Sequence, residues 1–523
     1  MKKINLVFGA MAIFTTSLFA QSSLKDIIKL TTNEQFQSAD EAFKKLVQVA
    51  PNNGEYYFYF GENYFKNDNI DLAKSTYQKG ADVNATHPLC YVGLGKVQWY
   101  QGKQADAKAN FFKATTLAAG KDPIVLMKIA EAYINADNKN LADAFTLLAQ
   151  AAKLDSKNLE VYLLTGDAFL EQNDGTKAIE NYEKAANLNS KSVEAILRQG
   201  QLYNRSRNYQ LAVEFYKKAI AIDSLFAPAH RELAEIYLRA NQFKNASTEY
   251  KRYLQINNDC GARSKFAGVL NQTKQYQESI DAAKEAMKCD SNNAYLYRYL
   301  AYDYYQLKDY ANGLKSCNKF FAKVNPEKII PQDYENRAKL NAQMGNDSLA
   351  IIDFKRIMEQ DSSRTEFNGD IANAYKKTKK YKDAIEYYNK KIKTGKANAN
   401  DYNGVGLCYY YSKDFINADS SFSQVVKQQP ELYIGYLWRA KSNAQLDPKN
   451  EKWQAKPFFE TFITKVKPEE IEKNKNYLIE AYNYLAAFYA EKKDSANTKL
   501  YMQKVLEIDP NNAQAKKILA GLK

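Results

Sequence analysis

Small residues recur at intervals near thirty-four residues along this chain, and this recurrence constrains its fold more than any other feature. Twelve residues after most of these positions comes a second small residue, and four residues later a bulky, mostly aromatic one. Two small columns and one bulky column at this period predict stacked helix pairs whose backbones approach closely at the small residues. The first column comprises Gly61, Gly95, Ala130, Gly166, Gly200, Ala234, Ala267, Ala301, Ala338, Ala372, Gly406, Ala440 and Ala486.

The residues within one period resemble the pattern of the tetratricopeptide repeat family. Tyr57, Phe60, Gly61, Ala73 and Tyr77 carry the pattern in one of the clearest units. The resemblance implies an all-α fold, a right-handed superhelical solenoid of about fourteen helix–turn–helix units. It implies little about function, because the same scaffold serves many partners.

The repeat register divides the chain into segments. We expect a signal peptide at 1–20, an N-terminal solenoid at 21–325, a proline-containing joint at 326–330 and a C-terminal solenoid at 331–512. The C-terminal solenoid contains an insert at 446–475, and residues 513–523 are expected to form a capping helix. Unit starts are expected near Ala20, Gly54, Pro88, Pro123, Leu159, Val193, Ala227, Cys260, Ala294, Pro331, Thr365, Ala399, Tyr433 and Ile479.

The N-terminal residues predict export. Lys2 and Lys3 precede a short apolar stretch, and Ala20 offers a cleavage site before Gln21. This order is typical of a secretory signal peptide, and the stretch is too short for a transmembrane helix. No Cys follows the apolar stretch, so we expect a periplasmic or outer-membrane-associated protein that is not a lipoprotein, with secretion as the alternative. The Lys-, Asn- and Tyr-rich composition resembles exported repeat proteins of the Bacteroidota.

The chain carries a formal net charge of +14. A basic surface suits nucleic acid or an anionic membrane, but an exported protein rarely meets its own nucleic acids. Lipopolysaccharide and anionic envelope glycans are the better candidates among anionic partners. The alternative is that Lys-rich helix faces simply keep a long solenoid soluble.

The cysteines do not form an obvious disulfide framework, because the five residues are scattered and odd in number. Cys317 and Cys408 lie at core-type helix positions and are expected to be buried. Cys260 and Cys289 fall at the same end of one predicted helical hairpin, so a disulfide between them and two free thiols both remain open.

Residues for catalysis are scarce. The chain has two histidines, His87 and His230, and metal sites and nucleophile–base pairs usually need more. No nucleophile elbow, zinc-protease motif or phosphate-binding loop occurs. We therefore expect a protein that is not an enzyme and needs no cofactor or metal.

In the family that the chain resembles, the first helices of the repeats line a concave groove. Arg and Tyr side chains outside the packing columns of these helices are typical of interface hot spots. Arg231 and Glu235 stand where a family clamp for C-terminal carboxylates has Lys and Asn, so that mode is not expected. A second aromatic stretch includes Tyr411 and Trp438. The candidate groove residues are Arg198, Asn204, Arg205, Arg231, Arg239, Arg298, Tyr302 and Tyr305.

The leading functional hypothesis is a non-catalytic exported scaffold that binds protein segments in its groove, with a role in envelope assembly, secretion or motility. One alternative is a protein that binds anionic glycan or lipopolysaccharide directly. Another is an accessory subunit that regulates a separate enzyme.

Overall fold

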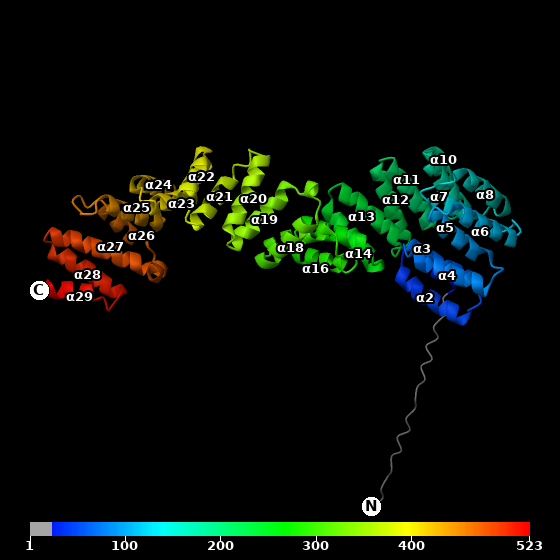
Figure 1. Cartoon of the computed structure of the whole chain (residues 1–523), viewed down its shortest axis with the longest axis horizontal. Helices are drawn as coiled ribbons and strands as arrows, with labels where there is room; N and C mark the ends of the chain where they lie inside the picture. The colour runs from blue at the N-terminus through cyan, green and yellow to red at the C-terminus, as the bar shows by residue number, and fades with distance from the viewer. Residues whose placement is uncertain (1–22, 523) are drawn as a thin grey trace, which may run out of the picture. The chain divides into compact units, whose positions relative to one another are not determined.

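The computed structural model describes residues 23–522, so the predicted signal peptide lies outside the described residues. Helices and turns make up these residues, which contain no strand (Figure 1). The first sixteen helices are α1 (Leu24–Thr32), α2 (Phe36–Val49), α3 (Gly54–Lys66), α4 (Ile70–Val83), α5 (Pro88–Tyr100), α6 (Gln104–Leu117), α7 (Pro123–Asn135), α8 (Leu141–Leu154), α9 (Leu159–Glu171), α10 (Gly175–Leu188), α11 (Val193–Arg205), α12 (Tyr209–Ile222), α13 (Ala227–Arg239), α14 (Phe243–Ile256), α15 (Cys260–Gln272) and α16 (Tyr276–Met287).

Thirteen further α-helices and two short 3-10 turns, η1 and η2, complete the described chain. They are α17 (Ala294–Gln306), α18 (Tyr310–Lys323), η1 (Pro326–Lys328), α19 (Pro331–Gln343), α20 (Asp347–Gln360), α21 (Phe367–Lys377), α22 (Tyr381–Lys393), α23 (Ala399–Tyr411), α24 (Phe415–Gln428), α25 (Tyr433–Leu446), α26 (Lys456–Lys465), η2 (Pro468–Glu470), α27 (Ile471–Glu491), α28 (Ser495–Ile508) and α29 (Ala513–Gly521).

Helices α1 to α28 form fourteen successive pairs, and α29 follows the last pair. Between α1 and α16, and again between α17 and α28, each pair packs against the next pair along the chain. The predicted all-α solenoid of helix–turn–helix units is therefore confirmed. Most first helices begin where the repeat register placed them, but α27 begins at Ile471 rather than near Ile479.

The small-residue column lets an aromatic ring of the second helix lie against the backbone of the first. A Cβ atom added at Gly61 would lie 2.3 Å from the Tyr77 ring, and one at Gly166 would lie 2.4 Å from the Tyr182 ring. Both distances are far below van der Waals contact, so the ring occupies the space of the missing side chain. The recurring small residue is thus a packing requirement.

Side-chain caps and left-handed turn residues fix the helix ends. Asp122 and Asn158 accept hydrogen bonds from backbone N–H groups at the starts of α7 and α9. The turn inside most pairs contains one residue with positive φ, such as Glu34 and Asp68, both at φ 57°. This conformation reverses the chain tightly between two antiparallel helices.

The described chain forms two compact units, of which unit 1 ends at Ser291 and unit 2 begins at Asn292. The proline-containing segment predicted as a joint lies inside unit 2, where η1 leads into α19. The domain boundary at 326–330 stays a prediction.

The segment predicted as an insert, 446–475, contains regular structure. It includes α26, η2 and the first turn of α27, and only the residues between Leu446 and Lys456 form a loop. Asp447 organises this loop by accepting hydrogen bonds from the backbone N–H groups of Glu451 and Lys452 at 2.9 Å each. Trp453 is buried and packs edge-on against Tyr484.

Cys260 and Cys289 form a disulfide, with their Cα atoms 6.2 Å apart. The bond joins the start of α15 to the residues after α16, so it closes the last helix pair of unit 1. Cys90, Cys317 and Cys408 are free thiols, and all three are buried.

Candidate functional site

One position in each first helix, the residue directly after the small-residue column, lies between neighbouring first helices. We call it the inner-face position. It is buried in α3, α5 and α7, half-buried in α9, α11 and α13, and exposed in α21. Its polar occupants are Glu62, Lys96, Glu131, Asp167, Gln201, Glu235, Tyr302, Lys339, Asn373 and Lys441, and its others are Gly268, Leu407 and Ala487.

In α3 to α9 these residues form a continuous chain of ion pairs. Lys96 Nζ lies 2.9 Å from Glu62 and 3.8 Å from Glu131. Lys128, which lies one turn before Glu131, is 2.9 Å from Glu131 and 2.7 Å from Glu160. Each first helix is therefore joined to the next by opposite charges.

Burial and ion pairing together set the protonation of this chain. Burial opposes charge on Lys128, but Glu131 and Glu160 outweigh it and raise the pKa of Lys128 well above its usual range. Burial alone would raise the pKa of Glu131, yet Lys128 and Lys96 hold that pKa far below its usual value. Lys128 and Glu131 are therefore both charged at neutral pH.

Tyrosines of the bulky column donate hydrogen bonds to the acidic inner-face residues. Tyr77 donates a hydrogen bond from its hydroxyl to Glu62 at 2.6 Å, and Tyr250 donates one to Glu235 at 2.8 Å. Burial and the nearby carboxylate raise the pKa of Tyr250 above its usual range. The bulky column thus both packs the repeat and orients the inner face.

The first helices of unit 1 surround a chamber of about 450 Å³. Its lining includes apolar side chains, such as Leu163, Leu197 and Phe226, and charged side chains, such as Glu62, Lys128 and Glu131. Helix α1 and the turn after it also line the chamber. Their lining residues are Ile28, Thr31, Thr32, Glu34 and Phe36.

The predicted groove arginines of unit 1 are bound to acidic or amide side chains of the same chain. Arg198 Nε lies 2.9 Å from both carboxylate oxygens of Asp167. Arg205 donates to Glu171 at 3.2 Å, and Arg239 donates to Asn204 Oδ1 at 2.9 Å. These polar contacts therefore connect neighbouring first helices along the groove, through Arg198, Asn204, Arg205 and Arg239.

Arg231 has a partner far away in sequence, because it donates a hydrogen bond to Glu34 in the turn between α1 and α2. Glu34 also accepts a hydrogen bond from the Tyr253 hydroxyl at 3.2 Å. Lys29 lies 2.9 Å from Asp223, and Asn33 donates to the same carboxylate at 3.1 Å. The first helix pair of unit 1 thus meets the end of the sixth pair and the seventh pair, and unit 1 closes on itself.

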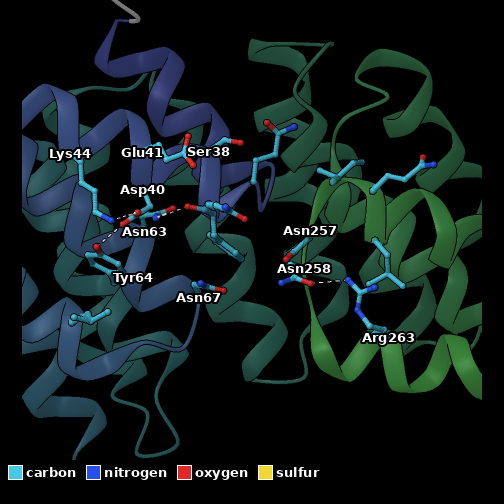
Figure 2. Close-up of a pocket in the computed structure, with 17 residues that line it drawn as sticks. Ser38, Asp40, Glu41, Lys44, Asn63, Tyr64, Asn67, Asn257, Asn258 and Arg263 are labelled. Atoms are coloured by element: carbon cyan, nitrogen blue, oxygen red, sulfur yellow. Dashed lines mark hydrogen bonds and ion pairs between the residues drawn. The ribbon is translucent and has the colours of Figure 1, made fainter. Parts of the chain in front are cut away.

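A polar cleft of about 690 Å³ lies beside this closure. Figure 2 shows its two walls, with Ser38, Tyr64 and Asn67 on one side and Asn257 and Asn258 on the other. Asp40 binds Lys44 at 2.6 Å, and Arg263 donates to Asn258 at 2.7 Å. Most other lining side chains are amides or hydroxyls, so the cleft is polar and open to water.

In unit 2, Arg298 and Tyr302 of α17 both bind Asp333 of α19, each at 2.7 Å. Asp333 is buried and also accepts a hydrogen bond from the backbone N–H of Ile330. Tyr305 is half-buried and packs against the Tyr310 ring at 5.8 Å. Arg298 and Tyr302 therefore hold the start of α19 in place.

Helix α21 carries accessible polar residues on the inner face of unit 2. Asn373 is exposed and accepts a hydrogen bond from Tyr388 at 2.7 Å. Asp370, one turn earlier, is exposed and has no hydrogen bond or ion pair within the described residues. Burial raises the pKa of Asp370, even though Lys339 and Lys391 lie near enough to oppose that rise. The Asp370 carboxylate is therefore partly surrounded by protein but still reached by water, as expected of a residue on a concave surface.

An aromatic patch is formed by Tyr381 at the start of α22, Tyr410 and Tyr411 at the end of α23, and Trp438 within α25. Tyr410 meets the Trp438 ring edge-on at 5.0 Å, and Tyr411 stacks on Tyr381 at 5.6 Å. Tyr411 is 54% exposed. The patch is the larger part of the second aromatic stretch expected from the sequence.

Within residues 23–522, no group of three or more His, Cys, Asp or Glu side chains is arranged to hold a metal ion. The same residues include no helix that is both long and apolar enough to cross a membrane.

Family models described as tetratricopeptide repeats match residues 163–225, 203–265, 365–393 and 479–512. The C-terminal part of a tetratricopeptide repeat-containing protein from Cytophaga hutchinsonii is 32% identical to this chain. That match covers 49% of this chain and 99% of the other, with a TM-score of 0.43. The chain belongs to the tetratricopeptide repeat family.

Two further solved structures with tetratricopeptide similarity are more distant. The pilF protein of Pseudomonas aeruginosa is 18% identical over 39% of this chain and 91% of its own, with a TM-score of 0.28. YrrB, described as a tetratricopeptide repeat protein with an unusual peptide-binding site, is 20% identical over 37% of this chain and 98% of its own, with a TM-score of 0.23. No functionally curated protein matches the chain.

Tetratricopeptide repeat proteins are generally scaffolds for protein interaction, and the family is typically non-catalytic. Sequence reasoning placed Arg and Tyr residues on the first helices of this repeat protein, but it missed their acidic partners. Glu62, Glu131 and Asp167 share the inner-face position, so the signal was present at one fixed offset from the small-residue column. At this position the prediction included Tyr302 and not the carboxylates Glu62, Glu131 and Asp167, because carboxylates are common in helices.

Proposed function

We propose that this tetratricopeptide repeat protein is an exported, non-catalytic scaffold that binds protein segments along the inner face of unit 2. One observation carries the proposal: in α21 the inner face presents Asp370, an accessible carboxylate without a partner among the described residues. The inner-face residues of α3 to α7 are instead buried and paired with each other.

The chemistry of the α21 surface favours a segment that brings a basic side chain. A charged hydrogen bond to Asp370 would be strengthened by the surrounding protein, which limits screening by solvent. The aromatic patch on α23 and α25 adds exposed ring surface of the kind found in binding hot spots. We propose that one extended segment contacts both.

The disulfide between Cys260 and Cys289 supports the proposal of export. Disulfides persist in oxidising compartments such as the bacterial periplasm and are rare in the cytosol. The identity to the Cytophaga hutchinsonii protein supports the resemblance to Bacteroidota repeat proteins. We therefore propose the periplasm or the periplasmic side of the outer membrane as the location, and envelope assembly, secretion or motility as the process.

The test is crosslinked capture of partners from the envelope fraction of the source cells, with the mature chain as bait. The inner-face variant combines Asp370→Lys with Tyr411→Ala. The matched control combines Asp383→Lys and Ile416→Ala, because these residues are exposed on the second helices α22 and α24. Arg298 and Tyr302 are unsuitable for this test, because their loss would leave the buried Asp333 without its partners.

We expect one or more protein partners to be captured by the wild type and the control and lost by the inner-face variant. Equal capture by all three chains would contradict binding at the inner face of unit 2. Salt-sensitive capture of envelope glycan without any protein would instead favour the direct glycan-binding alternative.

A further inference from the structure

The closure of unit 1 on itself is unlike the other contacts between its helix pairs. It joins residues about 190 to 220 positions apart, through Lys29, Asn33 and Glu34 on one side and Asp223, Arg231 and Tyr253 on the other. Neighbouring pairs are joined by shared apolar cores, whereas the closure consists of ion pairs and hydrogen bonds.

The apolar core of the first helix pair does not extend across the closure. Ile27, Ala39, Phe43 and Leu46 pack with Phe60 of α3, and none of the core residues of α13 or α14 joins that cluster. The polar cleft beside the closure separates the two sides further (Figure 2). The two sides of the closure therefore share no apolar core.

Water screens part of the closure. The Lys29 side chain is 64% exposed, and the Arg231 side chain is 33% exposed. The exposed Lys29–Asp223 pair contributes little to stability. The packing of the first pair against α3 depends on neither ion pair. The closure can therefore break while the first helix pair stays packed on α3.

The closure also controls the chamber. Ile28, Thr31 and Phe36 of the first helix pair line it together with Leu163, Leu197 and Phe226. We propose that the first helix pair, residues 23–49, is a latch that closes the chamber of unit 1. Breaking the contacts of Glu34 and Asp223 releases the latch and opens the chamber to solvent and to a protein segment.

The decisive residue is Glu34, since it joins Arg231, Tyr253 and Asn257 at one point. Glu34→Asn removes these contacts and retains a residue that tolerates the left-handed turn. Asp68→Asn is the matched control. Asp68 occupies the same turn of the next pair with the same φ of 57°, and its side chain makes no hydrogen bond or ion pair in the described structure.

The measurement is the rate at which a charged thiol reagent labels Leu197→Cys in the mature chain. Leu197 lines the chamber and is buried, and the natural free thiols are buried elsewhere. We expect Glu34→Asn to raise this rate by about tenfold, as for the loss of one charge-assisted hydrogen bond. Raising the salt concentration should raise the rate in the wild-type latch too, because exposed ion pairs are screened.

Hydrogen exchange of α1 and α2, in chains that keep Leu197, provides a second measurement that does not depend on the introduced thiol. Faster exchange and faster labelling in Glu34→Asn, with neither in Asp68→Asn, would support the latch. A charge exchange, Glu34→Arg with Arg231→Glu, should restore slow labelling. Unchanged rates in Glu34→Asn, or equal changes in both variants, would overturn the proposal. No partner is needed, so the result is independent of the function proposed for unit 2.

Discussion

At the scale of single residues, contact with an aromatic ring explains the glycines of the first small-residue column. Gly61, Gly95, Gly166 and Gly200 each lie against a ring of the following second helix. The same glycines precede the inner-face position, so one short motif sets both the packing of the repeat and the charge of its groove. A substitution of the glycine or of the residue after it should therefore alter both the packing against the second helix and the inner face.

Gly61→Ala should destabilise the second helix pair by about 1–3 kcal/mol, the usual cost of overpacking a core. The added Cβ would lie 2.3 Å from the Tyr77 ring, so the ring has to move. Gly102→Ala is the comparison, since Gly102 has open space around it and its cost arises only from its φ of +77°. Urea unfolding followed by circular dichroism measures both. If Gly61→Ala left the free energy of unfolding unchanged, the packing explanation would be contradicted.

Lys128→Met should destabilise α3 to α9 by about 3–5 kcal/mol at pH 7, because it leaves Glu131 and Glu160 without their buried partner. The pKa of Glu131 lies below its ordinary value of 4.5, so the wild-type contribution is present above that pH and is lost as the pH falls. The difference between variant and wild type should therefore shrink below about pH 4.5.

Stability is measured by denaturant unfolding over a pH series. Lys177→Met is the control, because the Lys177–Asp174 pair is largely exposed. A gap between Lys128→Met and the wild type that stays constant through the acid range would show that Glu131 is not charged in the folded protein.

At the scale of helices, the last pair of unit 1 differs from the others because a disulfide closes it. The pair consists of α15 and α16, which begin and end close together at the bond. Ser279 stands where most other repeats have alanine. The bond thus reinforces the pair that ends unit 1.

Replacing both Cys260 and Cys289 by Ser should destabilise this pair by about 2–4 kcal/mol, because the open chain gains conformational freedom when unfolded. Hydrogen exchange should quicken in α15 and α16 and remain unchanged in α5 to α9. Peptide mapping with and without reductant tests the bond itself. Two free thiols in protein isolated from the envelope would contradict both the bond and its use as support for export.

At the scale of the whole molecule, the two units have separate cores, and each is stabilised mainly by contacts between neighbouring helix pairs. Arrays of this kind unfold in parts, since the loss of one pair removes the support of only its neighbours. The distribution of tryptophan makes the parts easy to follow. Trp99 lies in unit 1, and Trp438 and Trp453 lie in unit 2.

The fluorescence of a Trp438→Phe, Trp453→Phe variant should report unfolding of unit 1, and that of Trp99→Phe should report unit 2. We expect different urea midpoints for the two signals, with circular dichroism showing both transitions. All three aromatic replacements keep a ring in place, so circular dichroism of each variant checks that stability is unchanged. Coincident midpoints in every variant would mean that the units unfold as one.

The sequence predicts the helix pairs well because their contacts are local and repeat at a fixed spacing. The groove was predicted only in part. Arg198 and Arg298 were placed on the first helices, but their binding to Asp167 and Asp333 depends on how consecutive pairs rotate. The contact between Glu34 and Arg231 cannot be predicted from the repeat spacing. It depends on the superhelical pitch, which is the sum of many small rotations between consecutive helix pairs.

The closure of unit 1 has a consequence for the order in which the protein forms. Helix pairs of unit 1 can assemble in chain order, since each needs only the pair before it. Lys29 and Glu34 must wait until Asp223, Arg231 and Tyr253 have arrived. The closing contact has high contact order in a chain of otherwise low contact order, so it forms last. Until the closure forms, the charged inner-face residues of unit 1 are accessible to proteins that bind nascent chains.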